Sequence, residues 1–419
     1  MWWPNPPCRL SRRRFLRDAG AAALVMALFP WRRAFGGASR ALAPDRWAVS
    51  PELITALRAR MAEDGVPALA VALGLPGGTP WARGFGALPD GSTAVAAGTA
   101  FPAGSLSKPV LATITLAVAS NGGFDLDRPL RDWLPGDDFP TGPGADRLTA
   151  RHALRHQSGL PNWRFDPAAP FALQVEPGTR WSYSGEGVFL VQRALEAATG
   201  HGLEALARKH VFGPLGMSSS TFLWRDDLAG RYAAAVAPAD ARMAAFAPYG
   251  ERRARALVAW ARDEGRDPAE TTYQDAVASD RPVRQRAAAM FGEPLPDVTP
   301  LPVVLTPNAA GSLVTTVPDY LRFVHAWLEN EDLRERAFDE PVAAADAIGW
   351  GVGWGLESGR APACFWHWAE GVGFRAFALG DPRAGEGIVV LASGDEGLGP
   401  ARLVVEGASG EPHPAFDFL

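Results

Sequence analysis

The chain has 419 residues, enough for one large domain or two interleaved domains around a substantial hydrophobic core. Residues 1–43 hold eight of the 41 basic side chains and one of the 46 acidic ones, so the remainder has 33 basic and 45 acidic groups, a net charge of about −12. An acidic chain without a basic stretch excludes nucleic acid and anionic membranes as partners.

The N-terminal segment predicts export. Residues 11–17 read Ser-Arg-Arg-Arg-Phe-Leu-Arg, and an apolar run follows at residues 19–29. This order is typical of a signal peptide for the twin-arginine export machinery. The apolar run is about half of the ~20 residues that a membrane-spanning helix needs, so we expect a removable signal and no stable membrane span. The mature protein is then periplasmic or secreted; the cleavage point within residues 1–43 stays open, and a basic disordered tail is the alternative.

The two cysteines exclude an intramolecular disulfide in the mature chain, because Cys8 leaves with the signal. Cys364 lies in the apolar run Ala-Cys-Phe-Trp and is predicted to be a buried thiol.

Strand patterns gather at both ends of the mature chain, and helix patterns fill its middle. One helix is predicted at residues 51–64 and a last short helix at residues 400–406. Strands are predicted at residues 68–75, 81–88, 353–357, 364–370, 374–379 and 387–393. Helix patterns dominate the middle, whereas residues 266–300 are polar and broken by prolines, which predicts a mobile loop or lid. The expected fold is α/β (α+β): an antiparallel sheet from both chain ends, flanked by helices, with an inserted mainly helical domain. The domain covers residues 44–410, with its α/β part at 44–110 and 301–410 and its helical part at 111–300.

Ser105 is a candidate nucleophile because of the lysine that follows it. Only two of the 41 basic residues are lysines, Lys108 and Lys209, and an amine can lose its proton in a protein, whereas arginine cannot. Apolar spacing predicts a helix from about residue 105 to about residue 119, with Pro109 in its first turn. Ser105 then lies at a helix N-terminus that favours negative charge, and Lys108 returns to the same helix face.

Tyr183 lies in a second polar segment, Glu-Pro-Gly-Thr-Arg-Trp-Ser-Tyr-Ser-Gly at residues 176–185. A Pro-Gly turn precedes it and a helix predicted at residues 186–199 follows, so the tyrosine is on a short loop held at both ends. Such a loop can direct a phenol toward a cleft; an ordinary buried tyrosine is the alternative.

His367 lies near the end of an aromatic strand, Phe-Trp-His-Trp-Ala-Glu-Gly at residues 365–371. Strand alternation places His367 on the face opposite Trp366 and Trp368. A core histidine with its hydrogen bonds satisfied is the alternative interpretation.

No metal or organic cofactor is expected. His152 and His156 have the spacing of a metal-binding pair on one helix face, but no third ligand accompanies them, so a structural role is predicted.

Taken together and in this order, these segments resemble the serine β-lactamase and penicillin-binding-protein-like superfamily, in particular its class C β-lactamase, DD-peptidase and family VIII esterase branch. The resemblance extends over nearly all of residues 50–395 and includes three further segments, at 149–161, 212–218 and 308–316.

The resemblance implies that Ser105 is acylated and that Lys108 accepts its proton. Tyr183 corresponds to the tyrosine of the family's Tyr-x-Asn motif, and His367 to the first residue of its Lys-Thr-Gly motif. The backbone N–H groups of Ser105 and Glu370 would form the oxyanion hole. The chain departs from the pattern at two positions: Gly185 replaces the asparagine and Ala369 replaces the glycine.

The function expected from this resemblance is that of an exported serine hydrolase with an acyl-enzyme mechanism, acting on small-molecule esters or amides and most consistent with a carboxylesterase. The missing asparagine removes a hydrogen-bond partner for an amide, which weighs against β-lactamase or D-Ala-D-Ala carboxypeptidase activity. These two activities stay as alternatives, as does a non-catalytic binding or sensor protein with the same fold. The sequence leaves the natural substrate and the oligomeric state open.

Overall fold

The computed structural model describes residues 47–419, except residues 137, 167, 238–243, 245–247, 296–302, 304 and 360. The predicted signal peptide therefore lies outside the described residues.

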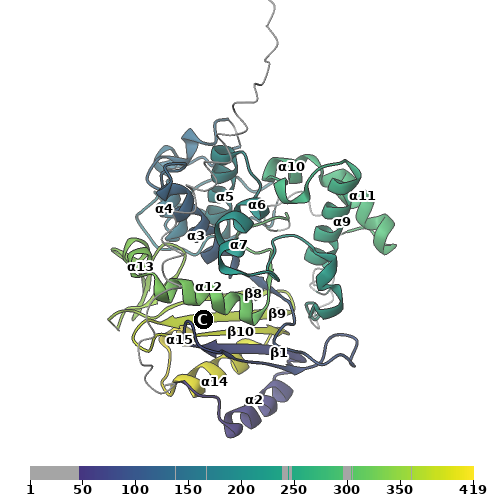
Figure 1. The fold of residues 1–419 in the computed structure, drawn as a ribbon. Helices are drawn as coiled ribbons and strands as arrows, with labels where there is room; N and C mark the ends of the chain where they lie inside the picture. The colour runs from purple at the N-terminus through teal and green to yellow at the C-terminus, as the bar shows by residue number, and fades with distance from the viewer. Residues whose placement is uncertain are drawn as a thin grey trace, which may run out of the picture. The chain divides into compact units, whose positions relative to one another are not determined.

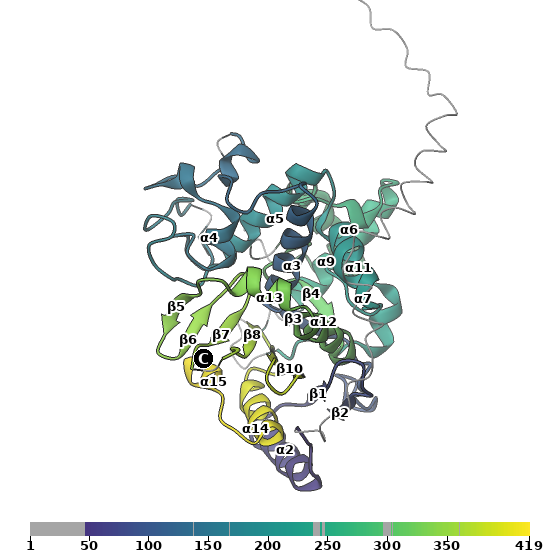
Figure 2. The same cartoon turned by 60° about the vertical axis from the view of Figure 1, so that its left-hand side comes forward.

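Eight strands form one antiparallel sheet that joins the two ends of the described chain (Figures 1 and 2). In spatial order the strands are β2 (Trp81–Gly86), β1 (Ala68–Gly74), β10 (Glu386–Ser393), β9 (Phe374–Asp381), β8 (Phe365–Gly371), β7 (Gly355–Glu357), β6 (Ile348–Trp350) and β5 (Val342–Ala345). The N-terminal strand β1 pairs with the last strand β10, with Val71 opposite Val390. This arrangement confirms the predicted fold class. Strands β5 and β6 were not predicted, because they are short and rich in alanine and glycine.

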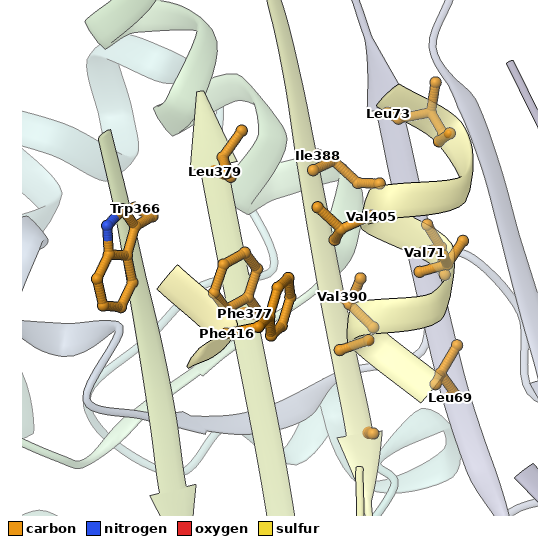
Figure 3. Packing of buried hydrophobic residues seen from close by; sticks show 14 of the residues in the cluster. Leu69, Val71, Leu73, Trp366, Phe377, Leu379, Ile388, Val390, Val405 and Phe416 are labelled. Atoms are coloured by element: carbon orange, nitrogen blue, oxygen red, sulfur yellow. The ribbon is translucent and has the colours of Figure 1, made fainter. Parts of the chain in front are cut away.

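Helices cover both faces of the sheet (Figure 1). One face packs on α2 (Pro51–Glu63) and α14 (Leu398–Ser409), together with the C-terminal helix α15 (Pro414–Phe418). Figure 3 shows this core, in which alternate side chains of β1, β10 and β9 meet Val405 and Phe416. The other face packs on α12 (Val317–Glu329), and a Cβ on Gly387 of β10 would lie 2.7 Å from Val324. Helix α13 (Glu331–Phe338) follows α12.

The middle of the chain is helical. Its α-helices are α3 (Ser107–Ser120), α4 (Ala150–Leu154), α5 (Gly185–Thr199), α6 (Leu203–Ala207), α7 (Gly213–Leu215), α9 (Tyr249–Asp263), α10 (Tyr273–Ala278) and α11 (Asp280–Phe291). The shorter turns are η3 (Leu130–Asp132), η4 (Ala145–Arg147), η5 (Arg208–Phe212), η6 (Asp226–Arg231) and η7 (Pro268–Glu270). A two-stranded sheet of β3 (Phe101–Gly104) and β4 (Leu313–Thr315) lies beside α3 and α12 in Figure 2.

The prediction of a mobile loop or lid at residues 266–300 is wrong over residues 266–295, which form η7, α10 and α11. Two of the prolines lie at helix starts, where no backbone donor is lost. Pro268 begins η7, and Pro282 lies in the first turn of α11. Thr272 and Asp275 form a capping box at the start of α10. Residues 296–300 lie outside the described residues.

Candidate active site

Ser105 is half-buried in the turn that connects β3 to α3. The helix begins at Ser107, two residues later than predicted, because the Leu106 N–H bonds back to the Ala103 carbonyl at 3.0 Å and closes a turn. Ser105 nevertheless lies directly before the helix N-terminus, where unpaired N–H groups favour an anion.

Gly104, the residue before Ser105, brings the ends of two strands together. Its φ is +46°, and a Cβ at this position would lie 2.9 Å from the Phe374 ring and 3.2 Å from the Ala369 Cβ. The close approach requires glycine at position 104 and leaves room for the methyl group of Ala369, where the family has a glycine. Ser105 and Glu370 follow directly on these two touching segments. Their roles as oxyanion N–H donors stay a prediction.

Lys108 is the charged group nearest the Ser105 hydroxyl. Its Nζ lies 2.8 Å from Ser105 Oγ and 2.7 Å from the Ala310 carbonyl oxygen, to which it donates. The side chain is 2% exposed, and this burial lowers the pKa of Lys108 to about 7. A substantial fraction of the amine is therefore neutral near pH 7 and has a lone pair for the serine proton.

Tyr183 lies over the lysine on the loop before α5. Its ring centroid is 4.9 Å from Lys108 Nζ and 4.8 Å from the Trp368 ring. The phenol oxygen is buried and has no hydrogen-bond partner among the described residues. Burial raises the pKa of Tyr183 well above its ordinary value, and the neighbouring Ser105 hydroxyl lowers it only in part. The phenol thus stays protonated, with the Ser105 hydroxyl as its polar neighbour.

His367 is fully buried on β8, near Lys108. Its Nδ1 donates to the Trp368 carbonyl at 2.7 Å, which leaves Nε2 as the acceptor; this nitrogen is buried without a partner among the described residues. Burial and the Lys108 charge lower the pKa of His367 to about 3, so the ring is neutral. Trp366 belongs to the hydrophobic core of the sheet and Trp368 packs against it, and the His367 ring lies 5.6 Å from Trp350 of that core and 5.4 Å from Trp368. The placement of His367 on the face opposite both tryptophans stays a prediction.

His156 also lies at the site, although the sequence predicted only a structural role for this histidine. Helix α4 ends at Leu154, and His156 has a φ of +56°, so it does not share a helix face with His152. Its ring is 4.2 Å from the Tyr183 ring, and its Nδ1 accepts the Ser184 N–H at 3.2 Å. Burial, with the charge of Lys108, lowers the pKa of His156 well below its ordinary value. His156 therefore supports the tyrosine loop as a neutral ring.

Trp163 is a second feature that the sequence analysis missed. A Cβ on Gly185 would lie 2.4 Å from the Trp163 ring, so the indole fills the space of a side chain at position 185. Asn162 fixes this arrangement, because its Oδ1 accepts the Gly185 N–H at 2.9 Å. The family's asparagine side chain cannot occupy this position unless the indole moves. A tryptophan near residue 160 has no local signal that would have revealed this packing.

The described residues contain no group of three or more His, Cys, Asp or Glu side chains that could hold a metal ion. They also contain no helix long and apolar enough to cross a membrane. Cys364 is buried, as predicted.

The model of the Beta-lactamase family matches residues 53–404, most of the chain. The chain belongs to the Beta-lactamase family. This family agrees with the resemblance found in the sequence, and the fold agrees too: a class C β-lactamase from Rhodobacter sphaeroides has a TM-score of 0.59 at 17% identity, over 85% of this chain and 99% of that one.

Two proteins with similar sequences are named as an esterase and as a penicillin-binding protein. "Esterase EstB" of Burkholderia gladioli is 29% identical over 153 residues, which cover 30% of this chain and 39% of the esterase. "Penicillin-binding protein 4" of Amycolatopsis lactamdurans is 29% identical over 154 residues, 33% of this chain and 40% of that protein. The chain thus spans about two-fifths of the length of these relatives.

Proposed function

We propose that the chain is an exported serine hydrolase that cleaves carboxylic esters through an acyl-enzyme on Ser105. The observation that carries the proposal is the 2.8 Å contact between Ser105 Oγ and the buried amine of Lys108. The esterase and penicillin-binding-protein names among its relatives are consistent with acyl transfer.

Lys108 and Tyr183 have different roles in the proton transfers. Lys108 accepts the Ser105 proton, because burial lowers its pKa to about 7, whereas burial raises the pKa of Tyr183. As the proton leaves, Oγ forms a bond to the ester carbonyl carbon and a tetrahedral oxyanion results. Tyr183 then relays the proton from the lysine to the alcohol oxygen as the carbon–oxygen bond breaks. Water attacks the acyl-enzyme by the same route in reverse and releases the acid.

The oxyanion is stabilised by the backbone N–H groups of Ser105 and Glu370. These donors are fixed by the contact between Gly104 and Ala369, so they need no reorganisation during the reaction. Loss of one such donor costs a rate factor of about a hundred or more.

An ester is favoured over a β-lactam or peptide because of Gly185 and Trp163. The amide that would bind an acylamino group is absent, and the indole closes its space. A substrate amide would therefore lose hydrogen bonds on binding that an ester never needs.

The test is a parallel assay of the purified mature protein on a nitrophenyl butyrate ester, a chromogenic cephalosporin and a D-Ala-D-Ala peptide. We expect kcat/KM for the ester to exceed the other two by at least about tenfold, the value of one lost hydrogen bond. Faster turnover of the cephalosporin or the peptide would contradict the ester preference. No turnover of any of the three would favour a binding or sensor protein.

A further inference from the structure

A cavity of about 640 Å³ opens beside the Ser105 turn and takes no part in the proton transfers. Its size is within the range of sites for small organic ligands. Six aromatic residues contribute to its wall: Phe165, Phe222, Trp224, Tyr232, Tyr249 and Phe374. All of these rings except Phe374 belong to the helical part, and the rest of the wall comes largely from residues 303–314, so the cavity lies where the helical and α/β parts of the chain meet.

Two residues of the cavity wall, Phe374 and Gly311, lie next to the surroundings of the reacting groups. Phe374 lines it, and the same ring lies 2.9 Å from the Cβ position of Gly104, next to Ser105. Gly311 also lines it and directly follows Ala310, whose carbonyl holds Lys108 at 2.7 Å. The cavity wall therefore lies against the residues that neighbour Ser105 and the carbonyl that binds Lys108.

Three polar side chains of the described cavity wall, Ser312, Asn308 and Glu251, have partners within the protein. Ser312 Oγ accepts the Asn308 N–H at 2.8 Å and lies 3.3 Å from the Phe222 carbonyl. Asn308 Oδ1 accepts the Ala310 N–H at 2.8 Å. Glu251 is paired with Arg255 at 3.1 Å. Since these groups already have partners, the cavity offers a ligand mainly apolar surface.

Phe165 stands at the edge of this cavity with 75% of its surface exposed. The segment that carries it is anchored, because the backbone N–H of Arg164 and its guanidinium bond to the buried Glu186 at 2.9 and 3.1 Å. A large aromatic ring held in solvent beside an aromatic cavity is suited to cover an apolar ligand.

We propose that this cavity binds a large apolar substituent, aromatic or alkyl, on the ester that Ser105 cleaves. The proposal rests on the proposed function and names its substrate class: esters with a bulky apolar group next to the scissile carbonyl, in place of the acylamino group that Gly185 and Trp163 exclude.

The first test uses two ester series on the mature protein. One series varies the acyl chain of nitrophenyl esters from acetyl to octanoyl, and the other varies the alcohol of acetate esters from ethyl to octyl. We expect kcat/KM to rise in one series by up to about fourfold for each added methylene that becomes buried. Equal kcat/KM values throughout both series would overturn the proposal while leaving Ser105 chemistry intact.

The second test fills the cavity. Gly250 lines it from the exposed side of α9, and a Cβ there meets nothing within 4 Å, so Gly250→Phe introduces a ring at an open position of the wall. We expect kcat/KM for the longest preferred ester to fall by about tenfold or more, the value of two lost methylenes, with the acetyl ester within twofold. Gly230→Phe is the matched control, because Gly230 has the same open surroundings and does not line the cavity. Equal losses on long and short esters would contradict the proposal.

A third measurement separates the cavity from catalysis. In Ser105→Ala, calorimetry of the uncleaved long ester measures binding alone, and we expect Phe165→Ser to weaken it. Phe165 is exposed, so this change leaves folding intact. Absence of ester turnover in the wild-type protein would refute the proposed function; equal affinity for long and short esters in Ser105→Ala would refute the apolar cavity.

Discussion

No carboxylate of the described residues shifts the pKa of Lys108. Burial alone lowers its pKa to about 7, and the groups within reach are a hydroxyl and a carbonyl oxygen. An arginine in this place would remain protonated. These contacts therefore favour the Lys108 amine as the base and the Tyr183 phenol as the proton relay.

A pH profile tests this assignment. The neutral fraction of the amine grows as pH rises through about 7, so kcat/KM for an ester should rise between pH 5 and 8 and then level off. The histidines do not account for such a rise, because the pKa of His367 is lowered to about 3 and that of His156 lies well below its ordinary value. A flat profile from pH 5 to 8 would argue against Lys108 as the base.

Replacement of the lysine separates its chemistry from its charge. Lys108→Arg should lower kcat/KM by at least about a hundredfold, since general-base assistance contributes about 10²–10⁴. Lys209→Arg is the control and should be nearly silent. Near-wild-type activity of Lys108→Arg, at equal folded concentration, would remove the base role.

Residues of the site differ in how far the sequence predicts them. Lys108 is three positions from Ser105, so local helix geometry alone brings the two together. His156 depends on a positive φ after the end of α4, and Trp163 on packing against a helix start 22 residues away. Such contacts have no periodic signal, which is why neither was predicted.

At the scale of elements, the start of α5 and the segment of residues 162–165 form one packed unit. Gly185→Asn should lower Tm, because its Cβ would lie 2.4 Å from the Trp163 ring. In a Trp163→Ala background the same change should cost less, with a coupling of about 1 kcal/mol or more. Thermal unfolding of the two single variants and the double variant measures this coupling.

Gly250→Asn is a matched control for that cycle. Gly250 lies in the first turn of α9, as Gly185 does in α5, but its Cβ position is open. We expect a change within about 0.5 kcal/mol there, as for other surface substitutions. Additive losses at Gly185 and Trp163 would show that the indole does not occupy the asparagine position.

The fold of the whole molecule depends on one sheet in which the N-terminal strand β1 pairs with the last strand β10. The apolar runs of β1 and β10 predict strands, and the position of the strand patterns at both ends of the chain predicts that these strands share one antiparallel sheet. Helix α15, after the predicted domain end at residue 410, was not foreseen because it has only five residues. Its Phe416 nevertheless stacks on Phe377 at 4.2 Å and completes the core.

Residues 1–43 predict that the whole chain is exported. Arg12→Lys with Arg13→Lys should leave the precursor in the cytoplasm of a host with twin-arginine export, because that machinery recognises the arginine pair. The pair Arg32→Lys and Arg33→Lys, which follows the apolar run, should be exported normally. Fractionation and immunoblotting measure the distribution, and unchanged export of the first variant would contradict the twin-arginine signal.

Covalent labelling tests the central claim most directly. The mature protein is treated with a serine-directed alkyl phosphonate, and the adduct is located by mass spectrometry of the intact protein and its peptides. We predict one adduct per chain, on Ser105, absent from Ser105→Ala and from the heat-denatured protein, because the hydroxyl reacts only beside the Lys108 amine. An adduct on any other residue, or unchanged labelling of Ser105→Ala, would contradict the assignment of Ser105 as the nucleophile.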